Sequence, residues 1–293
     1  MQSTSETMVV SSGRRLRQVS FGILLAVPAV MGLPTDAMAG ITVFEAAGAT
    51  GTDITAARDA FRTAVGGGSV AGAAGDFGGL RREINWDGVP AGFSDPNAMP
   101  ANFFNVNSPR GAVFSTPGTG FLVSANAGLA TPTLFGFPSD LQAFSAQKLF
   151  APTGSGIVDV SFFVPGTNTA ATTSAFGAVF VDADYTNAVE ATTMAIFDTS
   201  NTLIFSRAVT ATNNQGLSFL GGVADAGERI SRVRITTPLN FLVSNGVRNN
   251  ELSDFVVMDD FLYATPAAVP EPEIWAMALL GLAVIGWHTR KRC

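Results

Sequence analysis

Apolar and polar positions alternate in many short segments of the chain, which are rich in Val, Ile, Phe and Thr. In residues 157–164, Val158, Val160, Phe162 and Val164 share one face, and Asp159 and Ser161 lie on the other. Alternation with a period of two is typical of a half-buried strand. The segments predicted as strands are 41–45, 82–86, 111–115, 120–125, 156–164, 175–182, 193–198, 202–209, 216–221, 230–236 and 254–263.

Clusters of Gly, Asn, Pro, Ser and Thr separate these segments, and residues 198–201 (Asp-Thr-Ser-Asn) are typical of a hairpin turn. Many short strands joined by turns indicate an all-β fold. We therefore expect a β-sandwich with a jelly-roll-like topology, which the pattern favours over an immunoglobulin type.

One segment has helical spacing instead. Ile54, Phe61 and the apolar residues between them recur on one face of residues 54–65. Thr52 and Asp53 are candidate caps for its start, and three glycines follow its end. The sequence predicts one short helix near the N-terminus of the body.

The N-terminal end is typical of a secretory signal peptide. Arginines within residues 14–17 precede an apolar run at 21–31, and Ala37 and Ala39 form a small-x-small cleavage site. We expect signal peptidase to remove residues 1–39. The alternative is a transmembrane helix, for which the apolar run is short.

The C-terminal end has three parts. Pro270, Glu271 and Pro272 come first, an apolar run at 274–287 follows, and basic residues at 290–292 end the chain. As a helix the apolar run reaches roughly 21 Å, against a hydrocarbon core of ~30 Å. Basic residues tend to stay in the cytoplasm, so both ends face inward and the body between them faces out.

This tail, residues 269–293, resembles the PEP-CTERM sorting signal of Gram-negative bacteria. The resemblance implies that an exosortase-like membrane enzyme acts near the Pro-Glu-Pro motif. It also implies that the inner membrane holds the protein transiently before it reaches the cell surface or the exterior. Proteins with this signal are commonly associated with exopolysaccharide. The alternative is an ordinary tail anchor.

Between these signals, residues 40–268 form the predicted exported domain. They contain 11 Arg and Lys against 19 Asp and Glu, a net charge of −8 that disfavours nucleic acid as a partner. The only His and the only Cys, His288 and Cys293, lie in the tail. The body therefore has no Ser-His-Asp or Cys-His nucleophile system, and no His- or Cys-ligated metal site.

These exclusions favour a body that is not an enzyme. We expect a structural or glycan-binding module of the envelope or extracellular matrix. The alternative is a secreted glycoside hydrolase that uses two carboxylates.

Two aspartates at the end of a predicted strand are candidate calcium ligands. Asp182 and Asp184 are two residues apart, and Asn187 follows them. Oxygen ligands of this kind suit Ca²⁺, although the spacing is not that of an EF-hand. The alternative is a solvated strand end with a local turn.

Asp259 and Asp260 lie within the last predicted strand, where strict alternation puts them on opposite faces, so one of them is buried. A buried carboxyl group needs a hydrogen bond, an ion pair or a metal. The final strand resembles that of jelly-roll carbohydrate-binding modules, which implies a structural Ca²⁺ held by Asp260 and Glu45. The alternative is a buried Asp that accepts hydrogen bonds from backbone groups, or from Arg232 or Arg234.

Trp86 and Asp87 are candidates for ligand binding. Trp86 is the one tryptophan of the predicted mature body, and a Gly- and Pro-rich segment follows Asp87. An exposed Trp beside an Asp can stack on a sugar ring. The favoured alternative is a Trp packed in the core, and no feature pairs Asp87 with a second acid.

Overall fold

The computed structural model describes residues 40–125, 133–185, 190–244 and 247–269. All of the described residues belong to one compact unit. The predicted signal peptide with Ala37 and Ala39, the Pro270–Glu271–Pro272 motif and the apolar tail lie outside the described residues. Among the residues that are described, no helix is long and apolar enough to cross a membrane.

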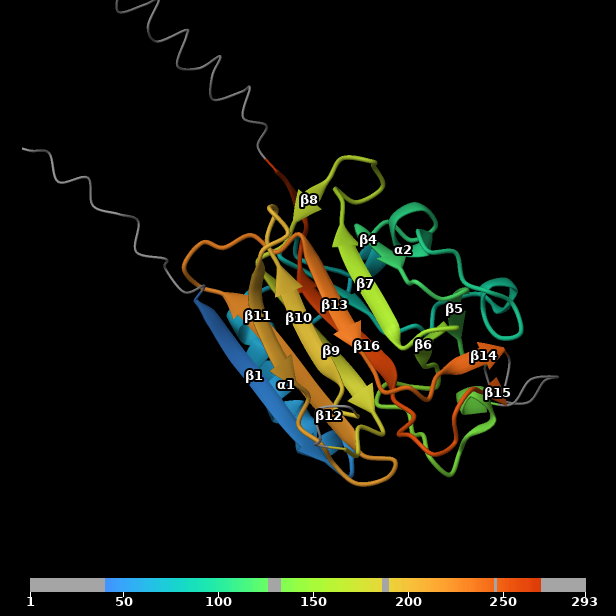
Figure 1. The fold of residues 1–293 in the computed structure, drawn as a ribbon. Coiled ribbons are helices and arrows are strands. Elements are labelled where there is room, and N and C mark those ends of the chain that lie inside the picture. Colours follow the sequence, from blue (N-terminus) through green and yellow to red (C-terminus); the bar gives the residue numbers. More distant parts are fainter. Residues whose placement is uncertain (1–39, 126–132, 186–189, 245–246, 270–293) are drawn as a thin grey trace, which may run out of the picture. The chain divides into compact units, whose positions relative to one another are not determined.

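The larger sheet has ten strands and is almost entirely antiparallel (Figure 1). Its main order is β1-β12-β9-β16-β6-β14-β15, and β3, β2 and β5 attach to β16, β3 and β6. The strands are β1 Ile41–Gly48, β2 Asp76–Phe77, β3 Arg81–Ile84, β5 Gly120–Val123, β6 Phe150–Thr153, β9 Ala175–Val181, β12 Leu217–Ala224, β14 Leu242–Ser244, β15 Val247–Arg248 and β16 Val257–Ala264.

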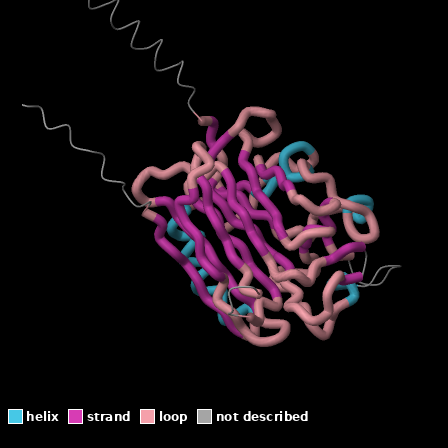
Figure 2. The backbone as a smooth tube through the Cα atoms, in the orientation of Figure 1, coloured by secondary structure: helices cyan, strands magenta, loops and turns pink. Residues whose placement is uncertain are grey.

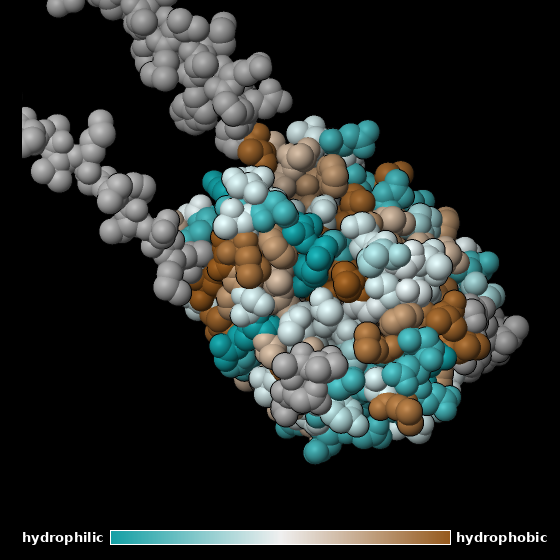
Figure 3. Space-filling view, in the orientation of Figure 1, coloured by the Kyte–Doolittle hydropathy of each residue, from teal (hydrophilic) through white to brown (hydrophobic). Residues whose placement is uncertain are grey.

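A second sheet has five strands in the order β11-β10-β13-β7-β4 and lies in front of the first in Figure 1. Its strands are β4 Ala112–Ser115, β7 Ile157–Phe162, β10 Thr193–Phe197, β11 Leu203–Ala208 and β13 Arg232–Thr236. A small third sheet pairs β8 (Ala171–Thr172) with β17 (Ala267–Ala268). In the space-filling view, hydrophilic residues lie among hydrophobic ones over the five-stranded sheet (Figure 3).

The longest helix lies behind the strands in Figure 2. Helix α1 (Gly51–Val65) covers the face of the ten-stranded sheet that points away from the five-stranded sheet. Helix α2 (Phe103–Val106) is a single turn, and three short 3₁₀ turns occur at Ala73–Gly75, Ala91–Phe93 and Thr133–Gly136.

Two hydrophobic cores hold these layers together. The first lies between the two sheets and includes Phe114, Val160 and Phe261. The second lies between the ten-stranded sheet and α1 and includes Phe61 and Phe219. Consecutive residues of the central strands β9 and β16 contribute to alternate cores, so both faces of these strands are buried.

Helix α1 forms where the apolar spacing predicts it, with Ile54 and Phe61 buried. Its cap is Thr50, two residues earlier than expected. The backbone N–H and the hydroxyl of Thr50 both donate to Asp53 Oδ2, at 2.8 and 2.9 Å. These bonds lower the pKa of Asp53 and fix the first turn. Gly66, at φ 89°, ends the helix.

The prediction of an all-β sandwich is confirmed, and each predicted strand overlaps a strand of the structure. The 198–201 turn joins β10 to β11 as expected, with Asp198 Oδ1 accepting from Ser200 N and Thr202 N, both at 2.8 Å. The sequence patterns missed β6, which contains Pro152, and the short strands β2, β8, β14, β15 and β17.

Strict alternation is wrong in β16. Its pairing with β9 shifts between Met258 and Phe261, which indicates a β-bulge at Asp259 and Asp260. Met258 and Phe261 consequently both face the core between the sheets. Both carboxyl groups of the bulge contact Ser145, in the segment that follows the 3₁₀ turn at 133–136. The two aspartates therefore lie on the same side of the strand.

Candidate metal centre and buried carboxyl pair

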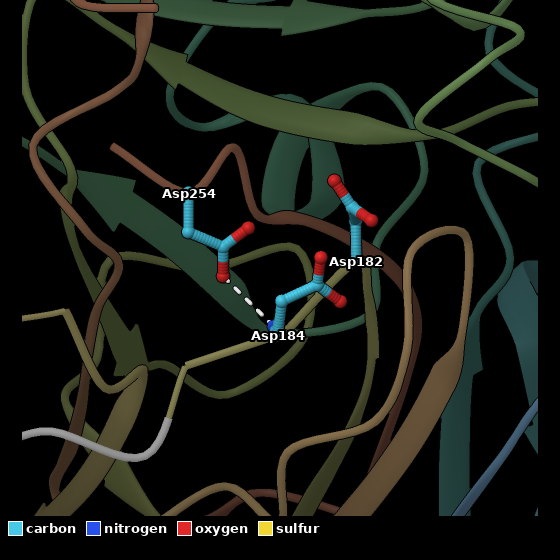
Figure 4. Close-up of side chains that lie close together, drawn as sticks. All are labelled: Asp182, Asp184 and Asp254. Atoms are coloured by element: carbon cyan, nitrogen blue, oxygen red, sulfur yellow. Dashed lines mark hydrogen bonds between the residues drawn. The ribbon is translucent and has the colours of Figure 1, made fainter. Parts of the chain in front are cut away.

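Three aspartates meet at one end of the ten-stranded sheet. Asp182 and Asp184 directly follow β9, and Asp254 precedes β16. Because β9 and β16 are antiparallel neighbours, the end of one strand lies beside the start of the other. One carboxylate oxygen of each aspartate lies within 4.8 Å of the others. The three side chains converge in Figure 4.

Backbone hydrogen bonds fix the positions of these carboxylates. Asp184 N donates to Asp254 Oδ2 at 2.9 Å, and Gln215 N donates to Asp182 Oδ1 at 2.8 Å (Figure 4 draws the first). Asp182 and Asp254 are 4% and 6% exposed. Asp184 Oδ1 is also buried, and it receives no hydrogen bond from any described residue. One carboxylate oxygen of the three aspartates therefore lacks a hydrogen-bond donor among the described residues.

Burial and mutual repulsion disfavour three negative charges at this position. Burial, with a smaller contribution from Asp184 and other nearby carboxylates, raises the pKa of Asp182 to about 7 and that of Asp254 to about 7. Burial also raises the pKa of Asp184. Arg248 lines the same hollow, but it pairs with Asp140 at 2.8 Å.

The donor set suits a hard divalent cation. Calcium takes oxygen ligands at 2.3–2.6 Å, so two ligands on opposite sides of one ion lie about 5 Å apart. The spacing of up to 4.8 Å between the carboxylate oxygens fits that limit. A hollow of about 240 Å³ adjoins the three aspartates, and Asn214 and Ser253 in its wall offer further oxygens. When bound, the ion would supply the positive charge that the cluster lacks.

Two of the three cluster residues are candidates already in the sequence. Asp182 and Asp184 lie together as expected, whereas Asn187 lies outside the described residues. Asp254 was missed, because it is 70 residues from Asp184 in the chain. Its position at the start of the last strand was the available signal, but only the pairing of β9 with β16 brings it to Asp182.

Asp259 and Asp260 form a separate buried pair. Asp259 accepts hydrogen bonds from Phe144 N, Ser145 N and Ser145 Oγ at 2.6, 3.2 and 2.9 Å. Asp260 Oδ1 lies 2.7 Å from the same Ser145 hydroxyl. Burial raises the pKa of both groups, and for Asp259 the neighbouring carboxyl adds to the rise. The pair therefore favours a shared proton.

The expected calcium site of Asp260 and Glu45 is wrong. Glu45 is in register with Leu220, which faces the core between the sheets, whereas Asp260 lies on the other side of the ten-stranded sheet. Glu45 pairs instead with Arg207 of β11, whose Nε lies 2.7 Å from Glu45 Oε2.

The arginine alternative for the buried pair is also wrong. Arg232 and Arg234 both pair with Asp159 of β7 across the outer face of the five-stranded sheet, with N–O distances of 2.7 Å. The part of the alternative that invokes backbone groups is confirmed, since Phe144 and Ser145 donate their N–H groups to Asp259.

Trp86 cannot stack on a sugar. Its side chain is 1% exposed, and its ring is parallel to that of Phe150 at 4.1 Å. Its indole N–H donates to the backbone carbonyl of Asp259, so the ring also anchors the bulge. Asp87 Oδ1 accepts the N–H groups of Gln147 and Lys148 at 3.0 Å and holds the start of β6 against the loop after β3. The structure thus assigns Trp86 to the core, as the favoured alternative predicts.

Comparison with known proteins identifies a sorting signal near the C-terminus of the chain. Residues 268–292 match the family model of the PEP-CTERM protein-sorting motif. The match confirms the resemblance in the tail, and it supports export through a C-terminal sorting signal with transient membrane anchoring. Proteins with this motif are processed by exosortase-type membrane enzymes. No curated protein matches the chain.

The folded body extends to the edge of the sorting motif. The match begins at Ala268, the last residue of β17, whose pairing with β8 ties this end of the chain to the body. The protein thus joins a β-sandwich directly to a C-terminal sorting signal.

Proposed function

We propose that the body is a structural module of the cell envelope or extracellular matrix, stabilised by Ca²⁺ and delivered by the sorting tail. The observation that carries the proposal is the convergence of Asp182, Asp184 and Asp254 within 4.8 Å. A buried carboxylate oxygen without a donor and the shortage of positive charge both favour a bound cation. An exported protein also meets far more free Ca²⁺ than a cytoplasmic one.

The proposed ion has a mechanical role. Asp182 and Asp254 belong to segments 72 residues apart, and an ion between them would fasten the end of β9 to the approach of β16. These are central strands, so the clamp would act on both cores at once. Any agent that binds the folded state alone stabilises it by mass action.

Thermal unfolding tests the proposal. The exported protein should melt at least about 2 °C higher in 5 mM Ca²⁺ than in chelator, because a dissociation constant of about 1 mM or tighter stabilises the folded state by roughly 1 kcal/mol or more. Asp254→Asn should lose most of the shift. Asp225→Asn is the matched control, because Asp225 is exposed and bonds only near β1. Identical melting of the wild type with and without Ca²⁺ would refute the proposal.

Glycan binding is a second candidate function, favoured by a cleft beside α1 that holds an arginine with no ion pair to any residue that the structure describes. Turnover is not part of the proposal. The hydrolase alternative depended on Asp87 and an exposed Trp86, and both residues have structural contacts. Incubation with matrix polysaccharide should therefore leave its viscosity unchanged, whereas a loss abolished by Asp87→Asn would favour the hydrolase.

A further inference from the structure

A cleft of about 400 Å³ opens between α1, the 3₁₀ turn at Ala73–Gly75, the end of β3 and the bulge in β16. It is far larger than a single water site and falls within the range of small-molecule pockets. The polar side chains that line it are Arg58, Arg62, Glu83, Asn85, Arg110, Ser145 and Asp260.

Two of its three arginines already have partners. Arg62 makes a two-pronged contact with Glu83, with Nε–Oε1 and NH2–Oε2 distances of 2.8 and 2.7 Å. The NH2 group of Arg58 lies 2.8 Å from Asp59 Oδ1. Their charges are largely satisfied within the protein, so neither is the principal attraction for a ligand.

Arg110 is different. Its Nε is buried and has no hydrogen-bond partner, and among the described residues no carboxylate lies within ion-pair distance of it. Its guanidinium lies 5.0 Å from the ring of Phe104, which fixes the side chain, and the positive charge of Arg82 is near. A half-buried guanidinium with unfilled donors favours a carboxylate, which matches its planar fork.

Other polar groups that line the cleft suit the hydroxyl groups of a ligand. Asp260 is 5% exposed and shares the Ser145 hydroxyl with Asp259, so the cleft presents a carboxyl and a hydroxyl at one position. Asn85 adds an amide to the lining. These groups can both donate and accept hydrogen bonds, as recognition of a polyol requires.

We propose that this cleft binds a sugar acid, with Arg110 pairing to its carboxylate and Asp260, Ser145 and Asn85 bonding its hydroxyls. The inference deepens the glycan-binding candidate and rests on it, because it names the ligand class of that function. It is independent of the calcium centre, which involves none of these residues.

Calorimetric titration of the exported protein at pH 7 tests the inference, with D-glucuronate, D-glucose and acetate as separate probes. Glucuronate should bind, glucose should bind at least about tenfold more weakly, and acetate should do the same because it lacks hydroxyls. Equal binding of glucose and glucuronate would overturn the sugar-acid inference but leave glycan binding standing. No binding of either sugar would overturn both. Equal binding of acetate and glucuronate would reduce the cleft to a carboxylate site and also overturn the inference.

Variants place the ligand in the cleft. Arg110→Met keeps the apolar stem over Phe104 and should weaken glucuronate binding by about tenfold or more. Arg229→Met removes an exposed arginine that does not line the cleft, and it should bind as the wild type does. If Arg110→Met does not fold, Arg110→Lys keeps the charge without the fork and should still weaken binding. Unchanged binding in a folded Arg110 variant would refute the site.

Discussion

Asp259 makes structural hydrogen bonds through both its carboxyl group and its backbone carbonyl. Its carboxyl group accepts the N–H groups of Phe144 and Ser145, and its backbone carbonyl accepts the indole N–H of Trp86. The bulge in β16 thus joins the segment before β6 to the aromatic cluster around Trp86. The raised pKa of Asp259 does not conflict with this role, because a protonated carboxyl group still accepts hydrogen bonds and also donates one.

Two substitutions of Asp259 should distinguish the contribution of its hydrogen bonds to the free energy of unfolding from the contribution of its charge. Asp259→Ala leaves the N–H groups of Phe144 and Ser145 without an acceptor and should lower the free energy of unfolding by about 2–4 kcal/mol. Asp259→Asn keeps an acceptor of the same shape and should cost less than half as much. Chemical denaturation of both variants gives the two values. An alanine variant as stable as the asparagine variant would contradict the assigned role.

The packing of helix α1 against strand β12 depends on a glycine in the strand. Phe61 of the helix lies over Gly221, where a Cβ would come within 2.7 Å of the Phe61 ring. Phe61 also packs edge to face against Phe219 and Phe44. The helix can approach the sheet closely because this position in β12 has no side chain.

Gly221→Ala should push Phe61 from its position and lower the free energy of unfolding by about 1–3 kcal/mol, since overpacking forces side chains off their preferred rotamers. Gly92→Ala is the matched control, because nothing lies within 4 Å of a Cβ at Gly92. Urea denaturation compares the two variants. Equal stability of both would mean that α1 is not seated on β12 as described.

Alternation located the strands because a half-buried strand has a period of two, and it failed where the period breaks. The bulge at Asp259 and Asp260 adds one residue to β16. Alternation counted from one end of the strand therefore assigns the residues beyond the bulge to the wrong face of the sheet. Pro152 concealed β6, since proline cannot donate to a neighbouring strand. Asp254 could not be joined to Asp182 without the strand order, which depends on pairing between distant segments. The sorting tail was recognisable because its three parts are contiguous.

The body has more acidic than basic residues, so the negative charges of its carboxylates have to be compensated. Most carboxylates of the described residues have an arginine or a backbone donor, as in the pairs of Asp159 with Arg232 and Arg234. The cluster of Asp182, Asp184 and Asp254 brings three carboxyl groups together beside buried strands, where burial disfavours their negative charge. Protons or a cation must offset that charge, so pH and Ca²⁺ should act on the same residues.

Stability without Ca²⁺ should consequently fall as pH rises. Asp182 and Asp254 have folded-state pKa values of about 7, above the ordinary 3.8. The folded state therefore holds more protons than the unfolded state between pH 4 and 7, and this contribution is lost as pH rises through 7. In chelator the melting temperature should drop by about 5 °C or more between pH 5 and pH 8.

Two comparisons make this pH test specific. Asp259 and Asp260 shift stability in the same direction, so the double variant Asp182→Asn with Asp254→Asn should remove only part of the drop. With Ca²⁺ present the drop should shrink, because the ion replaces the protons. A melting temperature in chelator that rises from pH 5 to pH 8 would contradict the account of the cluster.

The most direct test of the calcium-stabilised body is a calorimetric titration of the chelator-treated exported protein with Ca²⁺ at pH 7.5. The account predicts one site with a dissociation constant of about 1 mM or tighter, as in extracellular calcium modules. Asp184→Asn and Asp254→Asn should abolish it, and Asp225→Asn should leave it intact. No calcium binding by the wild type, or binding that persists unchanged in the cluster variants, would contradict the account.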